Sequence, residues 1–362
     1  MTVLIVFFHT EMTYGGEGSW YYREVPSSRA PFSIFATLST LTAQASLMGF
    51  FFLLAGYFTP KSFDRKGPVR FLLDRFLRLG IPLAAFIFLL SPITIAMIAA
   101  ARGDGFWPSI MLQWTTKDFY NGPMWFAEGL LILSVGYCLW RLIAARFLHS
   151  GPPSSQSNVA TVPSSRIWFL AALGVGGGAV LLRCFAPVDT RYFGLWVGYF
   201  SSYIFLFAVG AAAWRRDWLA RIPWKQARLW LIISCLVWPI MPLTYVALRL
   251  HGQRPYFAGG ISGPTFLYAF WEPFVAWGII AAWLVWFRDR FNRPSVVQSW
   301  LGRRAYTVYV IHPPVLVGVC LVFRHWHASA PLKCAVMGSL ACTAAWLLAD
   351  PLIRLPGLRR IL

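Results

Sequence analysis

Long apolar stretches, separated by short polar and basic segments, recur along the whole chain. A helix that spans a bilayer needs about 20 apolar residues. After a short first run at residues 2–9, nine stretches approach or exceed that length: residues 31–58, 79–101, 122–140, 167–187, 193–213, 228–248, 263–287, 305–323 and 332–350. The pattern predicts an all-α, polytopic integral membrane protein in which residues 1–362 form a single transmembrane domain.

Lysine and arginine are distributed unevenly among the segments that connect these stretches. When the connections are taken alternately, one set carries 22 of the 32 cations and the other set carries the remaining ten. Because basic loops stay on the cytoplasmic side, the richer set is expected to be cytoplasmic. Both termini belong to that set, so we expect an even number of membrane crossings.

The first run, Val3 to Phe8 followed by His9, is too short to cross a bilayer alone. Eight helical residues rise only about 12 Å. An even number of crossings nevertheless requires this run as the first helix, and we therefore expect about ten transmembrane helices. The first helix either extends through Tyr14 or, in the interpretation we favour, has its first half upstream of Met1.

The composition agrees with membrane insertion and argues against nucleic-acid binding. Hydrophobic residues make up 58% of the chain and charged residues 12%, whereas about a quarter of a soluble domain is charged. The net charge is +19, but the cations form short clusters and no basic stripe with interleaved aromatics. Six scattered cysteines without a Cys-x-x-Cys pair indicate neither zinc nor disulfides. Residues 149–166, rich in Ser and Pro, are predicted to form a disordered cytoplasmic linker.

Ionisable residues inside apolar stretches are candidates for function, because burying a charge in lipid is costly. Four stand out: His9, Glu128 in "GPMWFAEGLL", Glu272 in "FWEPF" and His312 in "YTVYVIHPPVLV". Each also has a structural explanation: His9 as a helix end at the outer interface, Glu272 as a helix kink or a paired acid, and His312 as a partner for carbonyls that the two following prolines set free. The residues alone leave these alternatives open.

Two further patterns indicate helix packing. Ser33, Thr37, Thr40 and Gln44 follow one another at spacings of four, three and four residues, so they share one helix face and are expected to form hydrogen bonds between helices. The run "GVGGG" begins with Gly174 and ends with Gly178. These two small residues favour close contact with a neighbouring helix.

Three segments resemble the acyltransferase family 3 membrane proteins. They are "FFLLAGYFTPKSFDRKGPVRFLLDRFLRLGIPL", similar to the family's second-to-third helix segment, and "GPMWFAEGLLIL" and "RAYTVYVIHPPVL", similar to its later helices. The resemblance covers nearly the whole chain. It implies an O-acyltransferase of the bacterial cytoplasmic membrane with acetyl-CoA or another acyl-CoA as donor. It also implies a carbohydrate or lipid-linked acceptor in the cell envelope, and no metal.

The resemblance also implies roles for individual residues. On its first helix the family has an arginine, ten residues and then a histidine. His9 matches the histidine, and the arginine is expected about two residues before Met1. Acyl transfer to a hydroxyl needs a base, and imidazole titrates near neutrality, so His9 is the expected general base. Glu128 and His312 are further catalytic candidates.

The donor and acceptor sites have their own candidates. The family's Arg-x-x-Arg motif matches Arg75 and Arg78, which stand on one helical turn. There they are expected either to bind the phosphates of coenzyme A or to anchor the helix at the cytoplasmic surface. Glu272, Trp125 and Gln44 are the candidates for contact with the acceptor.

A proton-coupled transporter or flippase of a polar or glycolipid solute is the alternative function. In that case the buried His9, Glu128, Glu272 and His312 relay protons or contact the solute. Two features favour the enzyme: no inverted repeat is visible, and an Arg-x-x-Arg motif accompanies an intramembrane histidine.

Overall fold

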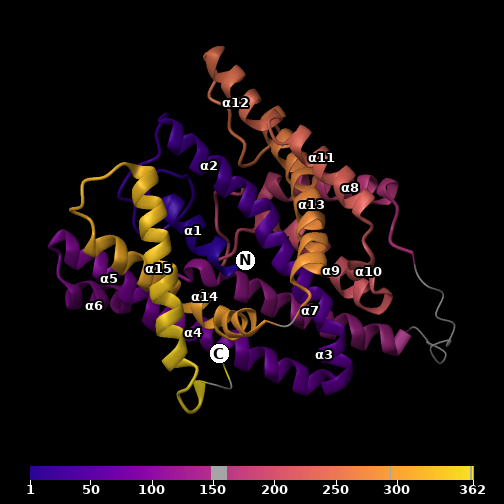
Figure 1. The fold of residues 1–362 in the computed structure, drawn as a ribbon, viewed down its shortest axis with the longest axis horizontal. Coiled ribbons are helices and arrows are strands. Elements are labelled where there is room, and N and C mark those ends of the chain that lie inside the picture. The colour runs from indigo at the N-terminus through magenta and orange to yellow at the C-terminus, as the bar shows by residue number, and fades with distance from the viewer. Residues whose placement is uncertain (148–160, 294, 359–360, 362) are drawn as a thin grey trace. The chain divides into compact units, whose positions relative to one another are not determined.

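The computed structural model describes residues 1–147, 161–293, 295–358 and 361. Over these ranges the chain is helical, with two isolated β-bridges and no strand (Figure 1). Eight helical segments of the described chain are long and apolar enough to cross a membrane, and α1 (Thr2–Thr13) is a shorter apolar helix. The predicted fold class, an all-α polytopic membrane protein, is confirmed.

One of these eight segments, Pro31–Arg102, contains two of the predicted stretches, residues 31–58 and 79–101. Its helical path is interrupted at Gly67, where φ is 72° and ψ is 169°. This left-handed φ is accessible to glycine but strained for other residues, and Pro68 follows it. The interruption separates the two stretches, while the count of ten crossings stays a prediction.

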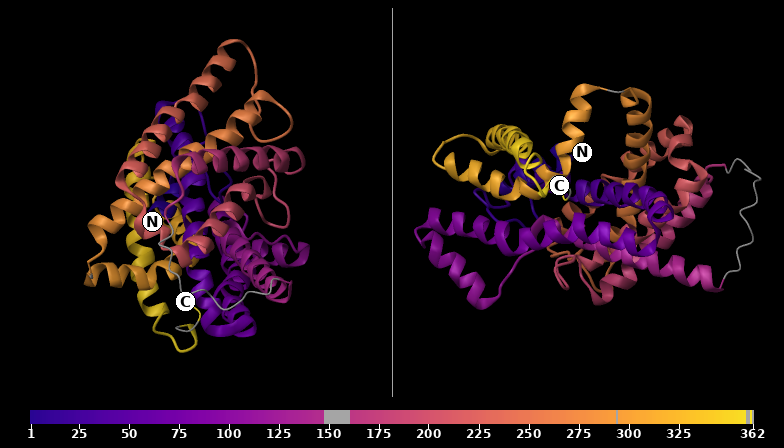
Figure 2. Two further views of the ribbon diagram at one scale, coloured as in Figure 1. Left: turned by 90° about the vertical axis from the view of Figure 1, so that its right-hand side faces the viewer. Right: turned by 90° about the horizontal axis from the view of Figure 1, so that it is seen from below.

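The described residues divide into two compact units, which we describe separately. The first unit comprises Met1–Ala43, Arg75–Glu128 and Pro294–Leu362. Its helical elements are α1, α2 (Pro31–Ala43), η2 (Phe76–Gly80), α4 (Ile81–Ala85), η3 (Phe86–Leu90), α5 (Ser91–Arg102), α6 (Phe106–Thr116), η4 (Gly122–Met124), α14 (Val296–Val322) and α15 (Ala330–Leu352). In this unit α14 packs along α15 (Figure 2). Helix α1 lies against both of them, and α5 packs on α14.

Small residues let α1 approach its neighbours. A Cβ atom added to Gly338 of α15 would lie 2.7 Å from a ring carbon of Phe7, so the ring would have to shift to admit a larger residue here. Helix α6 was not predicted, because its 11 residues are too few to span a membrane. It packs on α5, where the Gln113 amide donates a hydrogen bond to the Pro92 carbonyl at 3.4 Å.

The second unit comprises Gln44–Asp74 and Gly129–Arg293. Its helical elements are η1 (Gln44–Met48), α3 (Gly49–Arg75), α7 (Trp125–Phe147), α8 (Ser165–Phe185), η5 (Val197–Tyr199), α9 (Phe200–Arg216), α10 (Trp218–Arg221), α11 (Trp224–Val237), α12 (Ile240–Leu250) and α13 (Gly263–Phe291). Helix α13 is the centre of this unit, with α8 and α11 packed along it (Figure 1). The last residue of α3 and the first turn of α7 belong to the first unit.

The structure modifies two local predictions. Gly178 does pack closely, since an added Cβ would lie 2.7 Å from the Ser201 hydroxyl oxygen, but nothing lies within 4 Å of such an atom at Gly174. Gly176 makes the second close contact instead, against the Phe270 ring. Most of the predicted linker, residues 149–160, lies outside the described residues. Its end was placed too late, because α8 already begins at Ser165.

Candidate functional site

Two of the predicted catalytic residues come together in the first unit. The imidazole of His9, near the end of α1, and that of His312, in the middle of α14, are stacked with ring centroids 5.2 Å apart. The indole of Trp20 stacks on His9 at 4.1 Å and lies 6.2 Å from the His312 ring, again with nearly parallel planes. The exposed fractions of His9 and His312 are only 8% and 1%. We refer to His9, Trp20 and His312 as the histidine cluster.

The prolines after His312 fix the orientation of its ring. Pro313 has no amide hydrogen, so the carbonyl of Tyr309 loses its usual helical donor four residues later. His312 Nδ1 lies 2.6 Å from that carbonyl oxygen. A carbonyl only accepts, so Nδ1 carries the hydrogen of the neutral ring and Nε2 holds the lone pair. The structural explanation of His312 is thus confirmed, and it leaves one nitrogen available for chemistry.

Each member of the histidine cluster has a buried nitrogen without a hydrogen-bond partner. These atoms are His9 Nδ1, Trp20 Nε1 and His312 Nε2. A buried polar atom without a partner costs about 1–3 kcal/mol, so such atoms are rare in folded proteins. Three of them in one cluster are typical of a site prepared for a ligand or a reaction.

The segment of residues 14–30 carries Trp20 and is held against helix α2 by the polar stripe. The Ser33 hydroxyl donates to the Gly15 carbonyl at 2.6 Å, and the Glu17 amide donates to the Thr37 hydroxyl at 3.2 Å. The Thr40 hydroxyl is 3.2 Å from the Glu17 carbonyl. The expectation of bonds between helices is therefore wrong for these three residues, because their partners are loop backbone.

A largely buried ion pair holds the same segment at Glu24. Lys333 of α15 bonds to Glu24, whose other carboxylate oxygen accepts from the Tyr14 hydroxyl at 3.3 Å. Burial, with additional effects of the neighbouring Cys320 and Glu24, raises the pKa of the Tyr14 phenol well above its usual value. The alternating pattern of cations assigns Lys333 to a loop, but the structure places it inside α15 with 6% exposure.

Glu128 and Trp125 occupy the start of α7, next to the turn of α14 that carries His312. The Glu128 carboxylate accepts from the Asn121 amide at 2.8 Å and lies in the first helical turn, where the helix dipole favours a negative charge. Tyr309 joins this region to α14, since its hydroxyl bonds to the Pro123 carbonyl. Trp125 is 8% exposed, so its ring belongs to the packed interior.

Arg75 and Arg78 lie at the end of α3 and in η2, one turn apart as predicted. Arg75 is half-buried and Arg78 is exposed. Pro82 withholds the amide that would bond to the Arg78 carbonyl, and the Tyr306 hydroxyl of α14 donates to that carbonyl instead, at 2.6 Å. This bond anchors the turn with the two arginines to the helix with His312.

The remaining two candidates, Gln44 and Glu272, lie in the second unit. Glu272 forms a buried ion pair with Arg183 of α8, which is 0% exposed. The alternating pattern of cations assigns Arg183 to a loop, which is wrong, because the residue lies inside α8. Its guanidinium also lies 4.6 Å from the centre of the Tyr268 ring, and Gln44 donates to the Tyr203 hydroxyl at 2.9 Å.

These contacts form one chain of polar groups. The Tyr268 hydroxyl bonds with that of Tyr199 at 3.2 Å, and the Tyr199 ring stacks on that of Tyr203. The chain thus runs from the Arg183 and Glu272 pair to Gln44. The sequence signal for this chain of polar groups is the acid Glu272 within α13. Its partner Arg183 does not stand out from the other arginines of the sequence.

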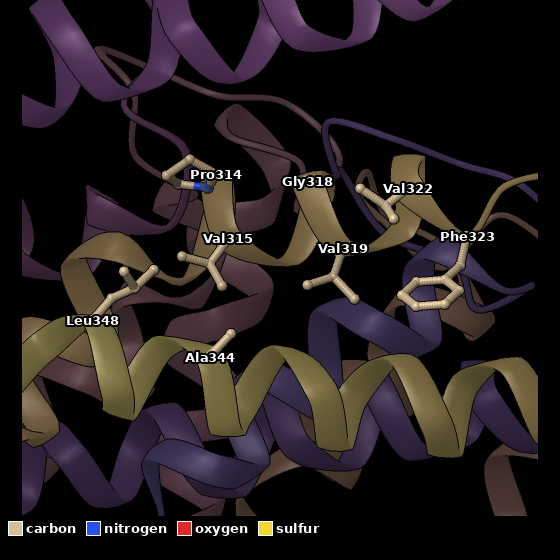
Figure 3. A pocket seen from close by; sticks show the side chains of 8 residues that line it. All are labelled: Pro314, Val315, Gly318, Val319, Val322, Phe323, Ala344 and Leu348. Carbon is tan, nitrogen blue, oxygen red and sulfur yellow. The ribbon is translucent and has the colours of Figure 1, made fainter.

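A groove between α14 and α15 opens directly after the His312 turn (Figure 3). Its volume is about 440 Å³. Figure 3 shows the side chains of Val315 and Val319 facing Ala344 and Leu348 of α15 across it. The lining is hydrocarbon, as expected for a surface that contacts lipid tails.

Within the described ranges, no three His, Cys, Asp or Glu side chains lie close enough together to hold a metal ion. The expectation of a metal-free reaction stays a prediction. Arg75 and Arg78 are the cationic residues that would bind the phosphates of the expected acyl-CoA.

Comparison with known families identifies the class of protein. The family model of acyltransferase family 3, described as an acyltransferase domain, matches residues 1–350. The protein therefore belongs to this family, as its residues predicted, and is a membrane-bound acyltransferase. Searches of curated proteins and of solved structures return no significant match.

Proposed function

We propose that the protein transfers an acyl group, in the simplest case acetyl, from acyl-CoA to a hydroxyl of a carbohydrate or other cell-envelope acceptor. The donor binds from the cytoplasmic side of a bacterial cytoplasmic membrane, and both termini of the chain lie on that side. The observation that carries this proposal is the histidine cluster. It buries two imidazoles with unpartnered nitrogens in a family whose members transfer acyl groups.

In this reaction His9 is the general base. It takes the proton of the acceptor hydroxyl while the hydroxyl oxygen forms a bond to the acyl carbon. The C–S bond of the thioester then breaks, and the departing sulfur of coenzyme A takes up the proton. The lone pair of His312 Nε2 provides a second proton acceptor beside His9.

Arg75 at the end of α3 and Arg78 in η2 suit the donor. Coenzyme A carries phosphates, and two guanidinium groups on one turn bind phosphate through charge-assisted hydrogen bonds. The Tyr306 bond to the Arg78 carbonyl couples this turn to α14, so donor binding and the histidine cluster share one helix.

Release of free CoA tests the proposal. Purified full-length protein in nanodiscs is incubated with radiolabelled acetyl-CoA, alone and with hydroxyl-bearing sugars, and the free thiol and labelled product are measured. We expect thiol release above that of empty nanodiscs, because water is able to replace the acceptor. Absence of both thiol release and labelled product under all conditions would contradict the proposed function.

A further inference from the structure

Trp20 is a member of the histidine cluster that no sequence motif indicated. Its indole lies almost parallel to the His9 ring, with 4.1 Å between centroids and 15° between planes. Because the two rings are stacked at this separation, the edge of the indole lies beside the edge of the imidazole. The indole nitrogen is buried and has no partner.

The chemistry of the indole limits its role. Its N–H group donates a hydrogen bond and accepts none, so it cannot compete with the imidazoles for a proton. Acyl transfer passes through a tetrahedral intermediate whose carbonyl oxygen becomes negative, and a fixed donor beside it stabilises that charge. We propose that Trp20 Nε1–H is this donor and that Trp20 is a catalytic residue, an inference that rests on the proposed acyl transfer.

The bonds made and broken then have defined partners. The acceptor oxygen adds to the thioester carbonyl carbon as His9 removes its proton, and the electron pair of the C=O bond moves to the carbonyl oxygen. Trp20 donates its hydrogen bond to that oxygen without losing its proton. When the carbonyl reforms, the C–S bond breaks, and the thiolate of coenzyme A takes the proton from His9.

The residue next to Trp20 is held in place by its own contacts, which limits the movement of the indole. The Tyr21 hydroxyl next to it bonds with that of Ser91 at 3.0 Å, and the Tyr21 ring fits against Gly122. A Cβ atom at Gly122 would lie 2.3 Å from the Tyr21 hydroxyl oxygen, and its φ of 47° is also costly for other residues. A preorganised donor needs no rearrangement as charge develops.

An unpartnered indole alone would not justify this assignment. The indoles of Trp218, Trp230, Trp277 and Trp346 also lack partners in the described structure. Trp20 differs from them because it stacks on a histidine that has an unpartnered nitrogen itself. Trp346 of α15 is 7% exposed and belongs to the same unit, so it offers a matched control.

The test compares Trp20→Phe with Trp346→Phe in the full-length protein, using acetyl-CoA as the probe. We expect Trp20→Phe to lower kcat by about 10²–10³-fold, with KM for acetyl-CoA nearly unchanged, because a donor to the oxyanion acts in the transition state. Trp346→Phe is expected to retain wild-type kcat. Equal kcat values for the two variants would overturn the inference.

A second substitution separates the hydrogen bond from packing. Benzothienylalanine at position 20 replaces the N–H group by sulfur and keeps the shape of the bicyclic ring. It is expected to fold like the wild type and to show the same loss of kcat. A wild-type kcat in the benzothienylalanine variant would also overturn the inference. Absence of activity in the wild-type protein would instead contradict the proposed function itself.

Discussion

The imidazole rings of His9 and His312 are stacked in the interior of the first unit, with centroids 5.2 Å apart and planes inclined by 20°. These two residues, 303 positions apart in the chain, thus form one buried site. The tautomer of His312, on α14, is defined by its bond to the Tyr309 carbonyl. A site of two adjacent imidazoles accounts for a histidine buried within the apolar helix α1. It also leads to predictions that separate the two rings.

Changing His312 to asparagine tests the role of its Nε2 atom. The asparagine amide is able to donate to the Tyr309 carbonyl as Nδ1 does, but it provides no lone pair at the position of Nε2. We expect normal membrane insertion and a melting temperature close to that of the wild type. Activity is expected to fall by about 10²-fold or more. Retained activity, measured as CoA release, would show that His312 serves the helix only.

Pro313→Ala is expected to lower activity without lowering stability. The new amide hydrogen competes with His312 Nδ1 for the Tyr309 carbonyl, so the tautomer of the ring is no longer fixed. Because an interior proline costs a helix about 3 kcal/mol, the variant is expected to melt at the same or a higher temperature. CoA release is expected to fall at least tenfold. Pro351→Ala in α15 is the control and should leave CoA release unchanged.

Glu272→Gln tests whether this carboxylate binds the acceptor or only pairs with Arg183. Loss of the carboxylate leaves a buried guanidinium without its counter-charge, which costs about 3–5 kcal/mol. We expect a much lower melting temperature for Glu272→Gln, and partial recovery when Arg183→Met is added. A wild-type melting temperature combined with a raised KM for the acceptor would instead assign Glu272 to acceptor binding, as the sequence suggested.

Replacing both Arg75 and Arg78 by alanine tests the donor site. We expect KM for acetyl-CoA to rise about tenfold or more while kcat changes little, because the phosphates bind equally in the ground and transition states. The double variant Arg65→Ala/Arg70→Ala removes the same charge from exposed positions of α3 and is the control. Equal KM values for the two double variants would make Arg75 and Arg78 membrane anchors.

Much of the fold was readable from the sequence, because lipid imposes long apolar helices that are visible as uninterrupted runs. His9 and His312 were also readable, since an ionisable side chain contrasts with such a run. Trp20 was not, because an aromatic residue in a loop carries no periodic signal. Arg183 is not recognisable from the sequence for another reason: it lies near a helix end, where a cation normally marks a loop. Only the structure shows that it is buried and paired with Glu272.

The central claim is that His9 removes the proton of the acceptor. The most direct measurement is kcat for acetyl transfer by His9→Gln, compared with the wild type, in full-length protein that inserts and binds acetyl-CoA normally. Glutamine keeps hydrogen bonding but cannot take a proton, so we predict a loss of about 10²–10⁴-fold in kcat. A His9→Gln variant with near wild-type kcat would contradict the account.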